Sequence, residues 1–94
     1  MTTWDESKRL ANLAKHGVDF RDLEGLDWER SLIFEDRRKD YGEMRLIAMT
    51  PLGMRLHVVV FVERGGERRI ISARRANSRE VAFYDRETRS SDRE

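Results

Sequence analysis

The sequence predicts an α+β fold in which two N-terminal helices and one C-terminal helix accompany a four-stranded antiparallel sheet. Residues 56–62 are almost continuously apolar and rich in valine, as expected of a central strand that is covered on both faces. Gly65 and Gly66 can adopt positive φ, which favours a hairpin into a returning strand over residues 68–73. Asn77 then begins an N-x-x-E capping box, which indicates that a helix follows the sheet directly.

The first helix is expected to begin at Asp5, whose side chain can cap it, and to end at Gly17, which suits a left-handed position. Its apolar residues recur at the spacing of one helix face: Leu10, Leu13 and Ala14. Trp4, just before the cap, is a candidate for a short additional strand. A second, shorter helix is expected after Asp19, with apolar positions at Phe20, Leu23 and Leu26.

The strands that precede the central one are weaker. Residues 31–35 alternate as an edge strand does, and residues 36–40 are charged throughout, which predicts a solvated connection. Residues 43–50 are expected to form the next strand, with Pro51 in the turn that closes it. In the returning strand the two-residue period predicts two faces: Arg69, Ile71 and Ala73 on one, and Ile70, Ser72 and Arg74 on the other.

Length and composition predict a single domain over residues 1–94, with a frayed tail over 86–94, where the chain becomes wholly polar after Arg86. The net charge of +1 means that any attraction for nucleic acid has to come from the distribution of charge. The chain has no cysteine, no apolar run long enough to span a membrane and no signal peptide, so a cytoplasmic protein is expected.

Basic residues concentrate where the last strand meets the last helix. From Arg64 to Arg79 the chain has six arginines and one acidic residue, Glu67, so this junction is a candidate anion site centred on Arg74 and Arg75. Internal ion pairs or an acidic partner would explain the same cluster. Three further basic residues, Arg37, Arg38 and Lys39, could touch phosphate, although a solvated loop explains them more simply. Lys15 and His16 fall in the last turn of the first helix, where the helix dipole favours cations.

Arginine, lysine and histidine are chemically sufficient to cleave RNA. A base draws the proton from the ribose 2′-hydroxyl, cations stabilise the phosphorane oxyanion, and an acid protonates the leaving oxygen. Arginine can hold two phosphate oxygens at once but stays protonated, so it is not a general base. Two isolated histidines without matching acids predict no metal site, and we expect no cofactor.

Several motifs, in order along most of the chain, together resemble the BrnT toxins of bacterial type II toxin–antitoxin modules. They are Trp4-Asp5, KHGV at residues 15–18, DYGE at 40–43 followed by Arg45, RIISARRA at 69–76, Arg79-Glu80 and Tyr84. The resemblance implies a compact RelE-like fold and an endoribonuclease activity that halts translation. It points to Lys15, His16, Arg74 and Arg75 as the catalytic cluster. It also implies a supporting or RNA-binding set: Glu43, Arg45, Arg79 and Tyr84.

The resemblance further implies a BrnA-like ribbon-helix-helix antitoxin as partner, with a BrnT dimer joined to an antitoxin dimer in a heterotetramer that contacts promoter DNA only through the antitoxin. A second hypothesis from the residues remains open: a non-enzymatic module whose basic junction binds an acidic antitoxin segment and acts as a transcriptional co-repressor. A partner that covers apolar surface would stabilise so small a core.

Overall fold

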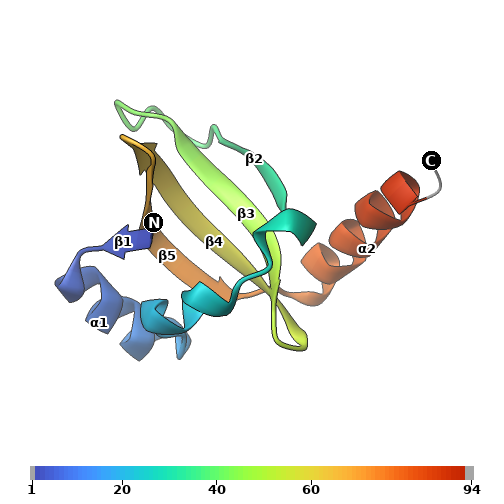
Figure 1. Cartoon of the computed structure of the whole chain (residues 1–94), viewed down its shortest axis with the longest axis horizontal. Helices are drawn as coiled ribbons and strands as arrows, with labels where there is room; N and C mark the ends of the chain where they lie inside the picture. The colour runs from blue at the N-terminus through green and yellow to red at the C-terminus, as the bar shows by residue number, and fades with distance from the viewer. Residues whose placement is uncertain (1, 93–94) are drawn as a thin grey trace.

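The structure, a computed structural model of the chain, describes residues 2–92, and the side chains of residues 2–89. Within these residues the chain forms a five-stranded mixed sheet with helices at its two ends (Figure 1). The elements are, in order, β1 (Thr2–Trp4), α1 (Glu6–His16), the 3-10 helices η1 (Phe20–Gly25) and η2 (Trp28–Arg30), β2 (Leu32–Asp36), β3 (Arg45–Leu52), β4 (Arg55–Arg64), β5 (Glu67–Arg75) and α2 (Ser78–Asp92).

The sheet has the strand order β1-β5-β4-β3-β2, in which β1 runs parallel to β5 and the other neighbours are antiparallel. The four strands expected to be antiparallel are β2 to β5, and the possible short strand at Trp4 is confirmed as β1, whose parallel pairing corrects the predicted antiparallel sheet to a mixed one. Three residues are too few to show a strand period, so only their pairing with Arg68–Ile70 reveals β1.

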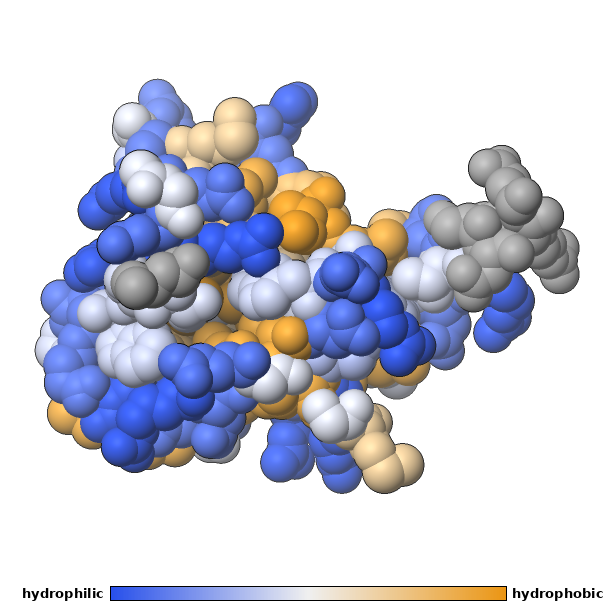
Figure 2. Space-filling view, in the orientation of Figure 1, coloured by the Kyte–Doolittle hydropathy of each residue, from blue (hydrophilic) through white to orange (hydrophobic). Residues whose placement is uncertain are grey.

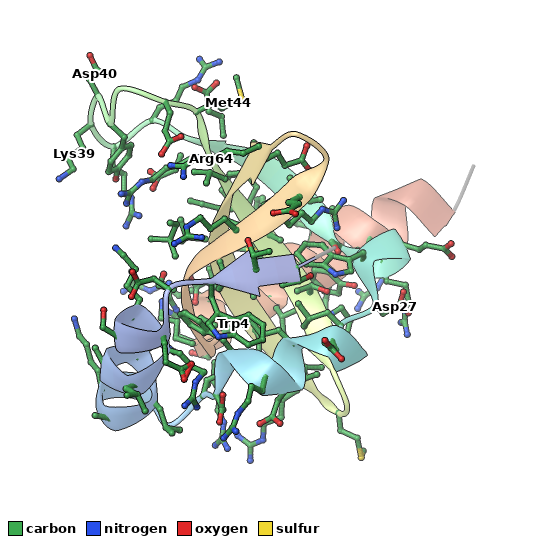
Figure 3. The ribbon with its side chains drawn as sticks, turned by 60° about the vertical axis from the view of Figure 1, so that its left-hand side comes forward. Trp4, Asp27, Lys39, Asp40, Met44 and Arg64 are labelled. Carbon is green, nitrogen blue, oxygen red and sulfur yellow. The ribbon has the colours of Figure 1, made fainter. Side chains whose placement is uncertain are left out.

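One face of the sheet, the core face, is covered by η1 and η2. Its buried residues include Phe20, Leu23, Val59 and Phe61. Trp4 leaves β1 towards η1 (Figure 3) and meets the ring of Phe20 edge-on, with 6.4 Å between ring centroids. The predicted second helix is confirmed as a short helix capped by Asp19, but it is a 3-10 helix.

The first helix packs against the sheet through polar residues. Arg9 and Asn12 are buried, at 8% and 6% exposure, whereas Leu10 and Leu13 are 53% and 38% exposed. The Asn12 amide donates to the carbonyls of Val18 and Ala73, at 3.0 and 2.8 Å, and its oxygen accepts the Ala73 N–H at 3.0 Å. β1 pairs with β5 only at residues 68–70, and at Ala73 the Asn12 side chain makes the hydrogen bonds that a neighbouring strand would make. The apolar helix face that the sequence indicated is exposed to solvent.

Two local expectations in the sheet were wrong. Pro51 lies inside β3, paired with Leu56, and the turn falls two residues later. Proline is tolerated there because β2 reaches only to Met49, which leaves this end of β3 as an edge. The register also shifts between Val60 and Phe61, so Ile70 and Ala73 both enter the core although the two-residue period separates them.

The capping box at the start of α2 is confirmed by mutual bonds of 2.9 Å between Asn77 and Glu80. The helix then projects away from the sheet (Figure 1) and continues to Asp92, so residues 86–92 of the predicted frayed tail belong to this helix. Residues 93–94 of that tail lie outside the described part of the chain. Across residues 2–92, each helix is too short or too polar to cross a membrane.

Figure 2 shows hydrophilic side chains over most of the side of the molecule that η1 and η2 cover. An apolar patch in this view lies near β2 and β3. Ile33, on β2, is 44% exposed. The face of the sheet that η1 and η2 leave uncovered holds a second apolar cluster around Met49 and Val58, and part of this face is open to solvent.

Candidate active site

The open face of the sheet holds a cleft of about 290 Å³, here called the sheet cleft. Its floor is apolar and consists of Phe34, Ile47, Met49, Val58 and Val60. Its rim is polar and consists of His16, Arg38, Ser72, Arg74 and Glu80. The pairing of the strands brings the lining of the sheet cleft together. One row of paired neighbours crosses the sheet from β2 to β5: Phe34, Ile47, Val60 and Ser72. Arg74 lies one row further along, paired with Val58, so the two-residue period places it over the same face.

Arg74 is held by a two-point ion pair with Glu80. Its Nη1 and Nη2 atoms each lie 2.8 Å from a Glu80 carboxylate oxygen, which raises the pKa of Arg74 and lowers that of Glu80. Glu80 is itself fixed, because its carboxylate accepts the Asn77 N–H. The guanidinium remains half-exposed at the rim. Arg74 is thus oriented by an internal ion pair while part of it stays accessible to an anion.

His16 ends α1 at the boundary between the sheet cleft and a shallower hollow of about 200 Å³. The helix stops there because Gly17 takes φ of 72° and donates its N–H to the Leu13 carbonyl. Lys15 lines the shallower hollow together with Lys8, and the two hollows share His16 and Ser72. The cationic end of α1 therefore adjoins the cleft on one side.

Arg38 is a site residue that the sequence interpretation assigned to a solvated loop. Asp36, expected in that loop, is buried at the end of β2, and Arg38 donates to both of its oxygens at 2.8 and 2.7 Å. Those bonds, helped by the Tyr41 hydroxyl, lower the pKa of Asp36 well below its usual range despite burial. A signal was present, because Asp36 follows Phe34 by two residues and so faces the same side of β2.

Arg74 and Arg75 were predicted to centre one anion site, but the structure places their side chains in two different hollows. Arg75 pairs with His57 on the core face and lines a separate hollow of about 270 Å³. His57 is buried, with Nδ1 3.0 Å from the Arg55 carbonyl oxygen, as expected of a packed histidine.

The four supporting candidates lie outside the lining of the sheet cleft. Glu43 lies in the same loop as Asp40 and Met44 (Figure 3), where its carboxylate forms an ion pair with Arg64 at 2.7 Å. The Arg45 guanidinium stacks over the Tyr41 ring, 4.0 Å from its centroid. Arg79 is exposed on the first turn of α2. Tyr84 is buried and donates its hydroxyl to the Arg30 carbonyl, which is a packing role.

Two arginine side chains on the rim of an apolar floor suit a phosphodiester that carries unstacked bases, which places this protein among candidate nucleic-acid-binding proteins. The sequence model of one family, described as the ribonuclease toxin BrnT of type II toxin–antitoxin systems, matches residues 4–80. A crystal structure of the Brucella abortus ribonuclease toxin BrnT is similar, with 32% identity and a TM-score of 0.66. That match covers 83% of this chain and 99% of the Brucella chain. No curated protein sequence matches. The chain belongs to the BrnT family of ribonuclease toxins of type II toxin–antitoxin systems.

Proposed function

We propose that this protein is a metal-independent endoribonuclease that inhibits translation, and that it cleaves RNA in the sheet cleft. The observation that supports the proposal is the convergence of His16, Arg38 and Arg74 on one cleft from three distant parts of the chain. Arginine side chains can hold the phosphate oxygens in fixed directions, and histidine readily exchanges protons near neutral pH. Membership of a family of ribonuclease toxins supports RNA as the substrate, and the lining of the cleft supports these three residues as the reacting groups.

In the proposed reaction the ribose 2′-oxygen attacks the adjacent phosphorus, and the bond to the 5′-oxygen of the next nucleotide breaks. The products are a 2′,3′-cyclic phosphate and a free 5′-hydroxyl, so no co-reactant is consumed. Arg38 and Arg74 stabilise the charge on the phosphorane oxygens, and His16 exchanges a proton with a reacting oxygen. Glu80 is a poor candidate for the base, because its ion pair with Arg74 lowers its pKa.

Lys15 has a different role in this proposal from the one that the resemblance implied. It lines the hollow next to the cleft and shares that hollow with Lys8. A chain of nucleotides that leaves the cleft past His16 would place its next phosphate beside these two lysines. Lys15 would then contribute mainly to RNA affinity, through a charge interaction that weakens as salt is raised.

The test is cleavage of a labelled RNA, with EDTA present, by wild type, Arg74→Ala, His16→Ala and Arg75→Ala. We expect a loss of roughly a hundredfold or more for Arg74→Ala, as for removal of a group that stabilises an oxyanion. Arg75→Ala is the matched control, because its side chain leaves the adjacent position on the other face of the sheet. Undiminished cleavage by a folded Arg74→Ala protein would remove the cleft from the mechanism.

The rest of the proposal concerns partners and location. We propose a BrnA-like ribbon-helix-helix antitoxin that neutralises the toxin, a toxin dimer within a heterotetramer, contact with promoter DNA through the antitoxin alone, and a cytoplasmic location. Family membership supports an antitoxin partner. Size-exclusion chromatography with light scattering on the co-expressed pair tests the stoichiometry, and a complex that is not two toxins with two antitoxins contradicts it.

One observation favours the alternative of a non-catalytic co-repressor. Arg74 already has a carboxylate partner in Glu80, which is what an internal ion pair of purely structural value would look like. This alternative predicts no RNA cleavage by the free protein, with or without translating ribosomes, together with operator binding that requires the antitoxin. Cleavage that depends on Arg74 rules it out.

A further inference from the structure

We propose that Phe34 is the stacking platform for an unpaired nucleobase of the RNA, an inference that rests on the proposed function. Phe34 lies on the edge strand β2 and is 41% exposed, although its side chain belongs to the floor of the sheet cleft. Phe34 is continuous with the other apolar residues of this floor, and an exposed apolar patch with a polar rim is typical of a ligand or partner site. The ring is therefore available to a planar group that enters the cleft.

The charges around Phe34 favour a nucleotide as that group. Arg38, bound to Asp36 only two residues from Phe34, brings a cation to the same end of the cleft. Arg74 brings a second cation from β5, three strands away, or roughly 14 Å between backbones. A nucleotide is apolar at the faces of its base and anionic at its phosphate, so it matches an apolar floor that has two arginine side chains on its rim.

The base has to be unpaired, because the faces and edges of a base inside a duplex are covered by its neighbours. Stacking on an aromatic side chain tolerates any base, and differences in stacking strength give modest base preferences. Phe34 would therefore favour single-stranded RNA and, through stacking strength, set a preference for the base next to the cleaved phosphate. A protein segment that inserts an apolar side chain could cover the same ring, and the experiment below separates the two.

The strand itself provides a matched control. Ile33 precedes Phe34, is exposed to a similar extent at 44%, and leaves β2 on the opposite side of the sheet. Replacing either residue by alanine removes a half-exposed apolar side chain from the same edge strand. A difference between Phe34→Ala and Ile33→Ala therefore reports the cleft and not a general loss of surface or of strand stability.

The experiment measures equilibrium binding of a 2′-O-methyl oligonucleotide, which cannot be cleaved, by fluorescence anisotropy. A second oligonucleotide series replaces one base at a time by an abasic site. We expect Phe34→Ala to bind the full oligonucleotide roughly 5- to 150-fold more weakly, the equivalent of one lost stack, whereas Ile33→Ala binds as wild type does. An abasic site at one position should weaken binding by wild type to the same extent and leave binding by Phe34→Ala unchanged. Phe34→Trp, which keeps an aromatic ring, should bind the full oligonucleotide about as tightly as wild type does.

Three outcomes overturn the inference: wild type does not bind the oligonucleotide, Phe34→Ala binds it as wild type does, or Phe34→Ala weakens only the antitoxin complex. Cleavage of unmodified RNA is measured separately. If Phe34 and one base prove coupled in binding while no RNA is cut, the proposed function fails and the stacking site stands. If RNA is cut at an unchanged rate and base preference by Phe34→Ala, the stacking site fails and the proposed function stands.

Discussion

Asn12 is predicted to stabilise the fold more than the leucines beside it on α1. The Asn12 side chain makes three hydrogen bonds, to both backbone groups of Ala73 and to the carbonyl of Val18. Leu10, by contrast, is 53% exposed. The sequence period alone suggests the reverse, since it marks Leu10 and Leu13 as one apolar face.

The magnitude follows from the groups left without partners. Asn12→Ala leaves one N–H and two carbonyl groups unpaired beside the core, and each such group costs about 1 kcal/mol at the low end of the usual range. The free energy of unfolding should therefore fall by about 3 kcal/mol, which lowers Tm by roughly 12–24 °C in a domain of this size. Leu10→Ala should cost less than about 0.5 kcal/mol, as for an ordinary surface change.

Urea denaturation followed by circular dichroism measures both differences. Asn12→Asp is a useful third variant, because it keeps the volume and one acceptor but turns a carboxylate towards two carbonyls. If Asn12→Asp lowers the free energy of unfolding as much as Asn12→Ala does, the loss comes from hydrogen bonding and not from packing. The reasoning is refuted if Leu10→Ala costs 2 kcal/mol or more, the range of a buried leucine, while Asn12→Ala leaves the urea midpoint unchanged.

Four further outcomes are expected. The pKa of Asp36 is depressed in the folded state, so its contribution to stability is present above about pH 3.9, the unfolded value, and is lost as pH falls through the folded pKa. Urea midpoints measured from pH 7 to pH 2 should therefore drop more steeply for wild type than for Asp36→Asn. Arg38→Lys keeps the charge but loses the planar fork, so roughly tenfold slower RNA cleavage is expected with an unchanged circular dichroism spectrum. Gly17→Ala should lower the free energy of unfolding by about 1 kcal/mol, since φ is 72° there, and Gly17→Asn should lower it less. Tyr84→Phe should cost about 1 kcal/mol in urea and leave the cleavage rate unchanged, and a selective loss of cleavage would return Tyr84 to the site.

The strands and helix starts could be predicted because their causes are local. The apolar run of β4, the glycine turn after it and the capping box at Asn77 each depend on residues that are near neighbours in the chain. Asp5 and Asp19 likewise accept bonds from backbone N–H groups two or three residues ahead. Such elements follow from propensity and capping, and the structure confirms them.

The site could be predicted only in part. The two-residue period already separates Arg74 from Arg75, yet their adjacency in the chain suggested one cluster. Arg38 was assigned to a solvated loop because its position depends on Asp36, whose burial needs the pairing of β2 with β3. Phe34 was treated as part of an ordinary edge strand, since no sequence feature shows that its face of the sheet stays open.

The sequence by itself determined the α+β class, the position of most elements and the basic character of the junction between β5 and α2, since each depends on neighbours in the chain. Tertiary structure decided which face of α1 is buried, which arginine enters the cleft and that His16 meets it. The physical reason is distance along the chain. Asn12 and Ala73, whose hydrogen bonds orient α1, are 61 positions apart, and a local period cannot register a bond over that separation.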